Sequence, residues 1–290
     1  MKSHRYSVDE LRGYLGTYFP RSFWESYDVS NAFFRKIFFD KFSDGCNLKI
    51  LDVGCGMGGA FFGLMFSLLE NFAIYTLVVD GLDANQESLH YFEKIIESRA
   101  FAKAREMQCQ TRMPGAQCLL RKSLKTCDLN EQKFNVLEDE RFYDVILSSK
   151  MLNEFDGDSA YETFLRFYLP RLTESGVCIV IDVNYKKPDG FLYVSQLFSS
   201  EVISFLNSNK EFKCAVPPAC SECVAYKCRG FNQSICERSD YDRTSPGVTI
   251  KDSKYCYRIF CREKLFEKLK GRLIEFDYKA NDNVICPRLS

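Results

Sequence analysis

The stretch at residues 50–59 constrains the fold more than any other part of this 290-residue sequence. It reads Ile-Leu-Asp-Val-Gly-Cys-Gly-Met-Gly-Gly, and a mostly apolar run over residues 60–69 follows it. Two apolar runs joined by a glycine cluster predict a strand, a tight turn and a helix. Glycine permits positive φ angles and close approach of a ligand, and a helix N-terminus offers free N–H groups. The stretch therefore predicts a nucleotide-type binding loop.

The glycines alone do not choose the ligand. Gly54, Gly56 and Gly59 also fit the G-x-G-x-x-G pattern of NAD-binding folds. Asp52 stands two residues before the first glycine, where an acid favours a ligand with an ammonium group, as in S-adenosylmethionine (SAM). The pyrophosphate of NAD would be repelled there. The other interpretation is a glycine-rich turn that only links a strand to a helix.

Strands and helices alternate along the chain, which predicts an α/β fold with a mostly parallel sheet covered on both faces. We expect strands at residues 49–53, 74–82, 117–124, 143–148, 177–183, 211–216, 255–261 and 273–278. We expect helices at 58–71, from Asn85, at 159–172 with Gly176 as the C-cap, and at 194–207, and a loop at 101–117. Two further helices, separated by Pro20, are expected within residues 7–42.

This pattern predicts four regions. They are an N-terminal helical cap at 1–45, a Rossmann-like domain at 46–216, a cysteine-rich insertion at 217–253, and the last strands with the C-terminal tail at 254–290. The cap either packs on the edge of the sheet or acts as a lid that contacts a substrate.

Acidic and polar residues follow the predicted strands, where ligands of such sheets bind. Asp83 ends the second strand and can accept both ribose hydroxyls of an adenosine, or can act as a helix cap or loop acid. Asp128 follows the third strand and can accept from the adenine amino group, or is a surface acid. Ser148 ends the fourth strand and would face the rest of the cofactor. Asn153 and Glu154 are the candidate catalytic residues after it.

With these residues the chain resembles the class I SAM-dependent methyltransferases over about residues 48–183. The resemblance implies a seven-stranded Rossmann-like sheet with an antiparallel last strand, and transfer of a methyl group to an acceptor. It also implies that Asp52 and the glycines line the methionine moiety, that Asp83 holds the ribose and that Asp128 lies near the adenine. The expected cofactor-binding residues are Asp52, Gly54, Cys55, Gly56, Gly58, Asp83, Ala84, Asp128 and Ser148.

The segment after the fourth strand reads Ser148-Ser149-Lys150-Met151. It lacks the Asn-Pro-Pro-Tyr tetrapeptide of enzymes that methylate amino groups of nucleic-acid bases, which disfavours that chemistry. The acceptor stays open among small molecules, proteins and RNA.

The cysteines cluster toward the C-terminus, with eight of the fourteen after residue 213. Cys220 and Cys223 form a C-x2-C pair, and Cys228 follows five residues later. With a distant fourth ligand, these thiols suit zinc or an iron–sulfur cluster. Cys286 is the first choice for that ligand, and Cys236, Cys214 and Cys256 are the other possible ones. Buried free thiols and a redox pair are the alternatives.

The segment from Cys228 to Gln233 also resembles methyltransferase-like proteins that assist small ribosomal subunits. That resemblance is confined to about residues 214–290 and implies an iron–sulfur cluster held by three such cysteines and a late fourth one. It implies an alternative function, in which the protein binds RNA or a ribosome precursor and SAM with little or no turnover.

Charge and composition exclude some classes of protein. The sequence has 39 basic and 39 acidic side chains, so bulk attraction to nucleic acid or membrane is not indicated. No signal peptide and no stretch able to span a bilayer are recognisable, and fourteen cysteines without an export signal favour reduced thiols. We therefore expect a cytoplasmic protein.

Overall fold

The computed structural model describes residues 8–36, 46–112, 114–115, 117–129, 142–155, 159–183, 194–216, 237–239 and 253–280. The chain divides into two compact units. Unit 1 comprises Met1–Gln132, Leu147–Ser149 and Ser239–Ser253, and unit 2 comprises Lys133–Ile146, Lys150–Arg238 and Lys254–Ser290. The four regions expected from the sequence stay a prediction.

The strands follow one another in the order β3-β2-β1-β4-β5-β8-β6, and β7 pairs with β8. β1 is parallel to β2 and β2 to β3, whereas β8 is antiparallel to β5 and β6. This is the order and direction of a class I methyltransferase sheet, so the predicted Rossmann-like fold class is confirmed. The strands are β1 (Cys46–Val53), β2 (Ile74–Asp83), β3 (Leu119–Thr126), β4 (Tyr143–Ser149), β5 (Leu172–Val183), β6 (Phe212–Val216), β7 (Glu237–Ser239) and β8 (Ser253–Arg262).

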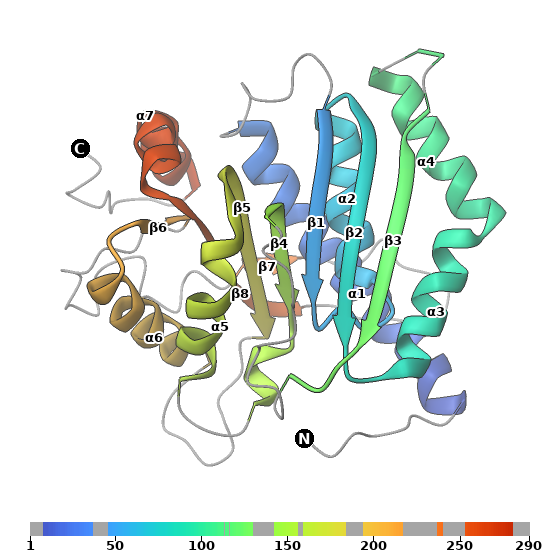
Figure 1. Ribbon diagram of the computed structural model, residues 1–290, viewed down its shortest axis with the longest axis horizontal. Helices are drawn as coiled ribbons and strands as arrows, with labels where there is room; N and C mark the ends of the chain where they lie inside the picture. Colours follow the sequence, from blue (N-terminus) through green and yellow to red (C-terminus); the bar gives the residue numbers. More distant parts are fainter. Residues whose placement is uncertain are drawn as a thin grey trace. The chain divides into compact units, whose positions relative to one another are not determined.

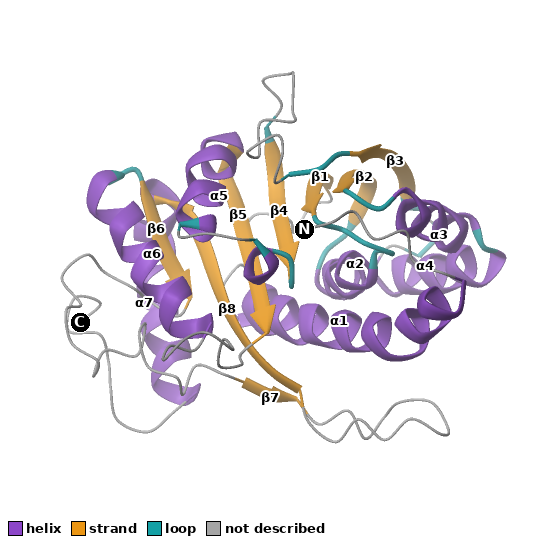
Figure 2. Cartoon of the chain, turned by 90° about the horizontal axis from the view of Figure 1, so that it is seen from below, coloured by secondary structure: helices purple, strands orange, loops and turns teal. Residues whose placement is uncertain are grey.

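In unit 1, β1, β2 and β3 lie side by side, as Figure 1 shows. Four helices lie on the same side of these strands (Figure 2): α1 (Val8–Lys36), α2 (Gly59–Asn71), α3 (Gln86–Glu97) and α4 (Arg99–Arg112). Lys122 of β3 ties the sheet to α3, because its ammonium group lies 2.7 Å from Glu93 and 2.6 Å from Glu97.

α1 packs closely on α2 because small side chains line both helices. They recur every fourth residue, at Gly59, Gly63 and Ser67 on α2 and at Ser22, Ser26 and Ser30 on α1. A Cβ atom added to Gly63 would lie only 2.1 Å from the carbonyl oxygen of Phe23, and one added to Gly59 would lie 2.9 Å from that of Phe19. Residues at spacing four share one helix face, so these stripes bring the two backbones together.

α1 corrects the prediction of two N-terminal helices, because Pro20 lies inside one continuous helix. Proline removes its own N–H donor and crowds the preceding turn, which normally ends or bends a helix. Here residues on both sides of Pro20 pack against α2, and this packing holds the helix together. The sequence indicates only the local effect of Pro20 on a helix and does not show the packing of α1 on α2. Residues 37–42 of the predicted second helix lie outside the described residues.

Two more helices correct predictions. α4 occupies most of the predicted loop at 101–117, because the Ser98 hydroxyl accepts from the Phe101 N–H (3.2 Å) and strong helix formers follow. α7 (Glu263–Ala280) includes the predicted strand at 273–278. Leu265 and Leu269, one turn apart, are both buried, so packing anchors the start of the helix. The helix then continues through residues 273–278.

Unit 2 contains α5 (Ala160–Tyr168), a 3-10 turn (Leu169–Arg171) and α6 (Val194–Ser208). Gly176 lies inside β5 and is not the predicted C-cap. A Cβ atom there would lie 2.7 Å from the Tyr143 carbonyl oxygen of β4, so the glycine permits a close approach of strands. The 3-10 turn begins at Leu169 and has Pro170 as its second residue, and the chain then enters β5.

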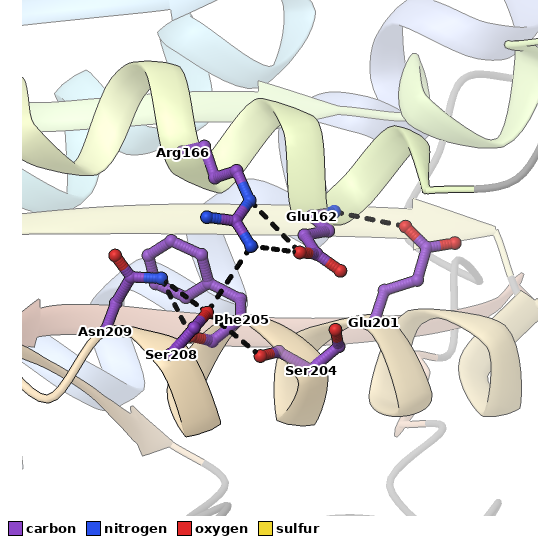
Figure 3. A network of polar contacts seen from close by, with 7 residues as sticks. All are labelled: Glu162, Arg166, Glu201, Ser204, Phe205, Ser208 and Asn209. Atoms are coloured by element: carbon purple, nitrogen blue, oxygen red, sulfur yellow. Dashed lines mark hydrogen bonds and ion pairs between the residues drawn. The ribbon is translucent and has the colours of Figure 1, made fainter.

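A buried carboxylate joins α5 to α6 (Figure 3). Glu201 of α6 accepts from the N–H groups of Tyr161 (2.8 Å) and Glu162 (3.1 Å) at the start of α5. Ser159 precedes α5 in the left-handed conformation and makes no side-chain cap, so Glu201 acts as the cap. Arg166 adds hydrogen bonds to Glu162 (3.0 Å) and to Ser208 of α6 (3.4 Å).

Candidate cofactor site

The glycine loop after β1 has the predicted strand, turn and helix geometry. The N–H groups of Gly54 and Cys55 both donate to the Leu82 carbonyl oxygen of β2, at 2.8 and 3.0 Å. Gly54, Gly56 and Gly58 have φ angles of 73°, 53° and 84°. Residues with a Cβ atom rarely adopt such angles, so the loop needs glycine at these positions.

Asp83 at the end of β2 holds this loop in place. One carboxylate oxygen, Oδ2, accepts from the Gly56 N–H at 2.7 Å, and Oδ1 accepts from the Asn85 N–H at 2.8 Å. Burial raises the pKa of Asp83, and these two hydrogen bonds oppose the rise. A carboxylate has about four acceptor sites, so Asp83 has further sites for hydroxyl groups of a ligand.

Asp52 of β1 is the most unusual group in the loop region. Its residue is 1% exposed, and neither carboxylate oxygen has a hydrogen-bond partner in the part of the chain that the structure describes. Burial, with a smaller contribution from the Asp83 charge, holds the pKa of Asp52 well above its usual range. Burying an unpaired carboxylate is unfavourable, so this position would gain from a bound cation or hydrogen-bond donor.

The other predicted residues of this site lie around the same loop or at strand ends of unit 1. Cys55 is buried, and burial raises the pKa of its thiol well above the usual range, which keeps it protonated. Ala84, which follows Asp83, and Asp128, which lies two residues beyond β3, are both half-buried. Ser148, near the end of β4, is buried, and its hydroxyl has no hydrogen-bond partner among the described residues.

The structure adds two residues that the sequence did not single out. A Cβ atom on Gly56 would lie 3.4 Å from the hydroxyl oxygen of Tyr14, so α1 reaches the glycine loop. The Tyr14 and Tyr18 rings lie 5.3 Å apart. Cys127 donates its N–H to the Asp83 carbonyl oxygen at 2.8 Å. The position of Cys127 directly after a predicted strand could have indicated that it lies at this site. The place of Tyr14 could not be predicted, because it depends on how α1 packs.

The candidate catalytic residues lie in unit 2. Asn153 donates both its backbone N–H (3.0 Å) and its side-chain amide to Asp182 of β5. Glu154 is exposed. A catalytic role for either residue stays a prediction.

The predicted metal ligands Cys220, Cys223, Cys228 and Cys286 lie outside the described residues. Within the described ranges, no three His, Cys, Asp or Glu side chains are grouped so that they could hold a metal ion. The helices in those same ranges include none that is long and apolar enough to cross a membrane.

Comparisons with known proteins give structural similarity only. No protein-family model and no curated protein matches this sequence. One similar structure is the plantazolicin methyltransferase BpumL in complex with SAH, with 14% identity, a TM-score of 0.47, and coverage of 88% of this chain and 91% of that one. Another is a SAM-dependent methyltransferase from Aquifex aeolicus, with 12% identity, a TM-score of 0.44, and coverage of 88% and 99%.

A SAM-dependent methyltransferase from Clostridium acetobutylicum is also similar, at 12% identity and a TM-score of 0.42. The match covers 82% of this chain and 90% of the Clostridium acetobutylicum chain.

Proposed function

We propose that unit 1 binds SAM at the glycine loop and that the protein transfers the methyl group to a nucleophilic acceptor. The buried Asp52 carboxylate, whose oxygens have no hydrogen-bond partner among the described residues, supports this proposal more than any other single observation. It lies beside a loop whose glycines permit close approach of a ligand, and its charge would pair with the ammonium group of SAM.

The other residues have complementary roles in this proposal. Asp83 would accept from the ribose hydroxyls, Asp128 would accept from the adenine amino group, and Ser148 would contact the remaining part of the cofactor. Transfer from a sulfonium requires mainly that nucleophile, methyl carbon and sulfur be aligned. A base is needed only if the acceptor must lose a proton, and Glu154 would then take that proton, whereas Asn153 would contact the acceptor without accepting a proton.

Calorimetry with SAM, 5′-methylthioadenosine and NAD tests the cofactor. Methylthioadenosine keeps the adenosine but lacks the ammonium group. We expect Asp52→Asn to weaken SAM binding by about 10–100-fold, because a charge-assisted contact contributes about 1.5–3 kcal/mol, and to leave methylthioadenosine binding unchanged. Asp83→Asn should weaken both ligands.

Asp80→Asn is the matched control, because Asp80 is also a buried acid of unit 1 but pairs with Lys49 at 3.9 Å. Binding of NAD in preference to SAM, or equal SAM affinity in Asp52→Asn and the parent, would contradict the proposal. Labelled methyl transfer from SAM to fractionated RNA, protein and small molecules then separates an active enzyme from the alternative assembly factor without turnover.

A further inference from the structure

Two buried thiols meet in unit 1, away from the glycine loop. Cys109 lies near the end of α4, and Cys118 lies directly before β3. The two residues are 1% and 4% exposed. α4 ends and β3 begins at the same end of unit 1 (Figure 1), which is the amino end of the parallel strands. The glycine loop follows the carboxyl end of β1, so the thiol pair is separate from the candidate cofactor site.

The strand pattern places the Cys118 side chain on the side of the sheet that carries the helices. Leu120, Lys122 and Leu124 are half-buried, whereas the residues between them are exposed. Lys122 reaches Glu93 of α3 at 2.7 Å, so these even-numbered side chains face the helices. Cys118 continues the alternation and is buried, so its thiol points the same way.

α4 brings Cys109 into the same layer. Phe101, Arg105 and Cys109 recur every fourth residue and therefore share one face of the helix. The Phe101 ring packs on Phe62 of α2, with 4.9 Å between the ring centroids. Met107, on another face of α4, is 63% exposed. The face that holds Cys109 is thus the buried one.

The two thiols contact each other and differ in character. The Cys118 thiol and the Cys118 N–H both donate to the Cys109 sulfur, and Arg105 adds a positive charge one helical turn away. Donors and a positive charge favour a thiolate, so they lower the pKa of Cys109 although its burial opposes this. The same contact raises the pKa of Cys118. Because the thiolate is the nucleophile in thiol chemistry, Cys109 is the more reactive of the two.

We propose that Cys109 and Cys118 form a reversible disulfide bond when the protein meets a hydroperoxide, with Cys109 as the attacking thiol and Cys118 as the resolving thiol. In the first step the Cys109 thiolate attacks a peroxide oxygen, an S–O bond forms, the O–O bond breaks, and the leaving hydroxide takes up a proton. In the second step the Cys118 sulfur attacks the sulfenic acid, an S–S bond forms, and the S–O bond breaks. The hydroxide leaves as water with the Cys118 proton. The two thiols lose two electrons, and hydrogen peroxide becomes two water molecules.

The turn between the two cysteines allows the sulfur atoms to approach. A disulfide needs them about 2 Å apart, which is closer than a hydrogen bond holds them. Pro114 and Gly115 of this turn are exposed, and a Cβ atom added to Gly115 would meet no described atom within 4 Å. Cys46, at the start of β1, is a third thiol at this end of the strands. Among the described residues no three such side chains could hold a metal ion, so the pair is a dithiol and not part of a metal site.

Peptide mapping of the full chain tests the proposal. Trypsin cleaves after Arg105, Arg112 and Arg121, so the two thiols fall in separate peptides, residues 106–112 and 113–121. The folded protein is treated with hydrogen peroxide, and the remaining thiols are then alkylated. We expect these two peptides to be linked, with a mass two hydrogens below their reduced sum, and to separate again with dithiothreitol. Cys178, buried in β5, is the control in the same sample and should stay reduced.

Two variants test the roles of the thiols. In Cys118→Ser the sulfenic acid on Cys109 cannot be resolved, so dimedone should label Cys109. In Cys109→Ser dimedone should leave Cys118 unlabelled. Separate peptides in the oxidised parent, linkage of either peptide to Cys46, or equal labelling in the two variants would overturn the proposal. The parent measurement does not require a variant to fold, and its result does not depend on whether the protein binds SAM.

Discussion

At the scale of single residues, Asp52 is unfavourable for folding, and in the proposed function the same carboxylate would bind the cofactor. A carboxylate that is buried without a hydrogen-bond partner among the described residues loses its hydration and gains nothing in return. Asp83, close to the same loop, differs because two backbone N–H groups compensate its burial. Asp83 therefore holds the loop together, and in the proposed function it would also contact the ligand, whereas Asp52 would serve the ligand alone.

This contrast predicts that Asp52→Asn stabilises the free protein. Because the pKa of Asp52 is raised in the folded state, the folded protein binds the proton more tightly than the unfolded chain does. The contribution of Asp52 to stability is then present at low pH and is lost as the pH rises through the raised pKa. We expect the variant to match the parent near pH 4 and to exceed it by about 1–3 kcal/mol at high pH.

Thermal unfolding at several pH values measures this difference. Saturating SAM should reverse the order of the two proteins at high pH, because a ligand stabilises the form that binds it more tightly. A variant less stable than the parent at every pH, with no ligand present, would contradict this prediction, because it would mean that the Asp52 carboxylate stabilises the folded protein.

At the scale of elements, Gly63 of α2 and Gly13 of α1 affect the stability of α1 in different ways. A Cβ atom added to Gly63 of α2 would overlap the α1 backbone, whereas one added to Gly13 of α1 would meet no described atom outside that helix within 4 Å. The first glycine allows the helices to approach, and the second only weakens the helix that contains it.

Alanine at these two positions should therefore have opposite effects. In Gly63→Ala the new Cβ would overlap the Phe23 carbonyl, which should lower the free energy of unfolding by about 1–3 kcal/mol. In Gly13→Ala the better helix propensity should raise it by up to about 1 kcal/mol. Urea unfolding followed by circular dichroism gives both values, and a Gly63→Ala protein as stable as the parent would contradict the close packing of α1 on α2.

At the scale of the whole molecule, the thiols fall into two groups. The described cysteines form no disulfide bonds and, except for half-buried Cys46, are buried in the two units. They include Cys214 and Cys256, in β6 and β8. The predicted ligands form the other group, in the segment around Cys220 and near the C-terminus at Cys286. Buried strand thiols behave as small apolar side chains, so a metal site is expected only from the second group.

We predict that protein purified without oxygen carries zinc or an iron–sulfur cluster, bound by Cys220, Cys223, Cys228 and Cys286. Elemental analysis should find about one site per chain in the parent, and loss of the metal in Cys220→Ser and Cys286→Ser. Cys46→Ser is the control and should keep the metal. Less than about a tenth of an equivalent in the parent would leave these cysteines as ordinary reduced thiols.

The sequence by itself determined the features that depend on local chemistry. Glycines at 54, 56 and 58 require a turn with positive φ angles, and apolar runs of strand length predict where the main strands lie along the chain. Asp83 could be placed at the end of a strand for the same reason.

Only the tertiary structure decided the features that depend on distant partners. Pro20 lies within a helix because α1 packs along α2, and Gly176 lies within β5, where it permits the close approach of a β4 carbonyl. Asn153 is held by Asp182, twenty-nine residues away, and Asp52 has no partner among the described residues. A sequence pattern records which groups can bond, whereas long-range packing selects which of them meet.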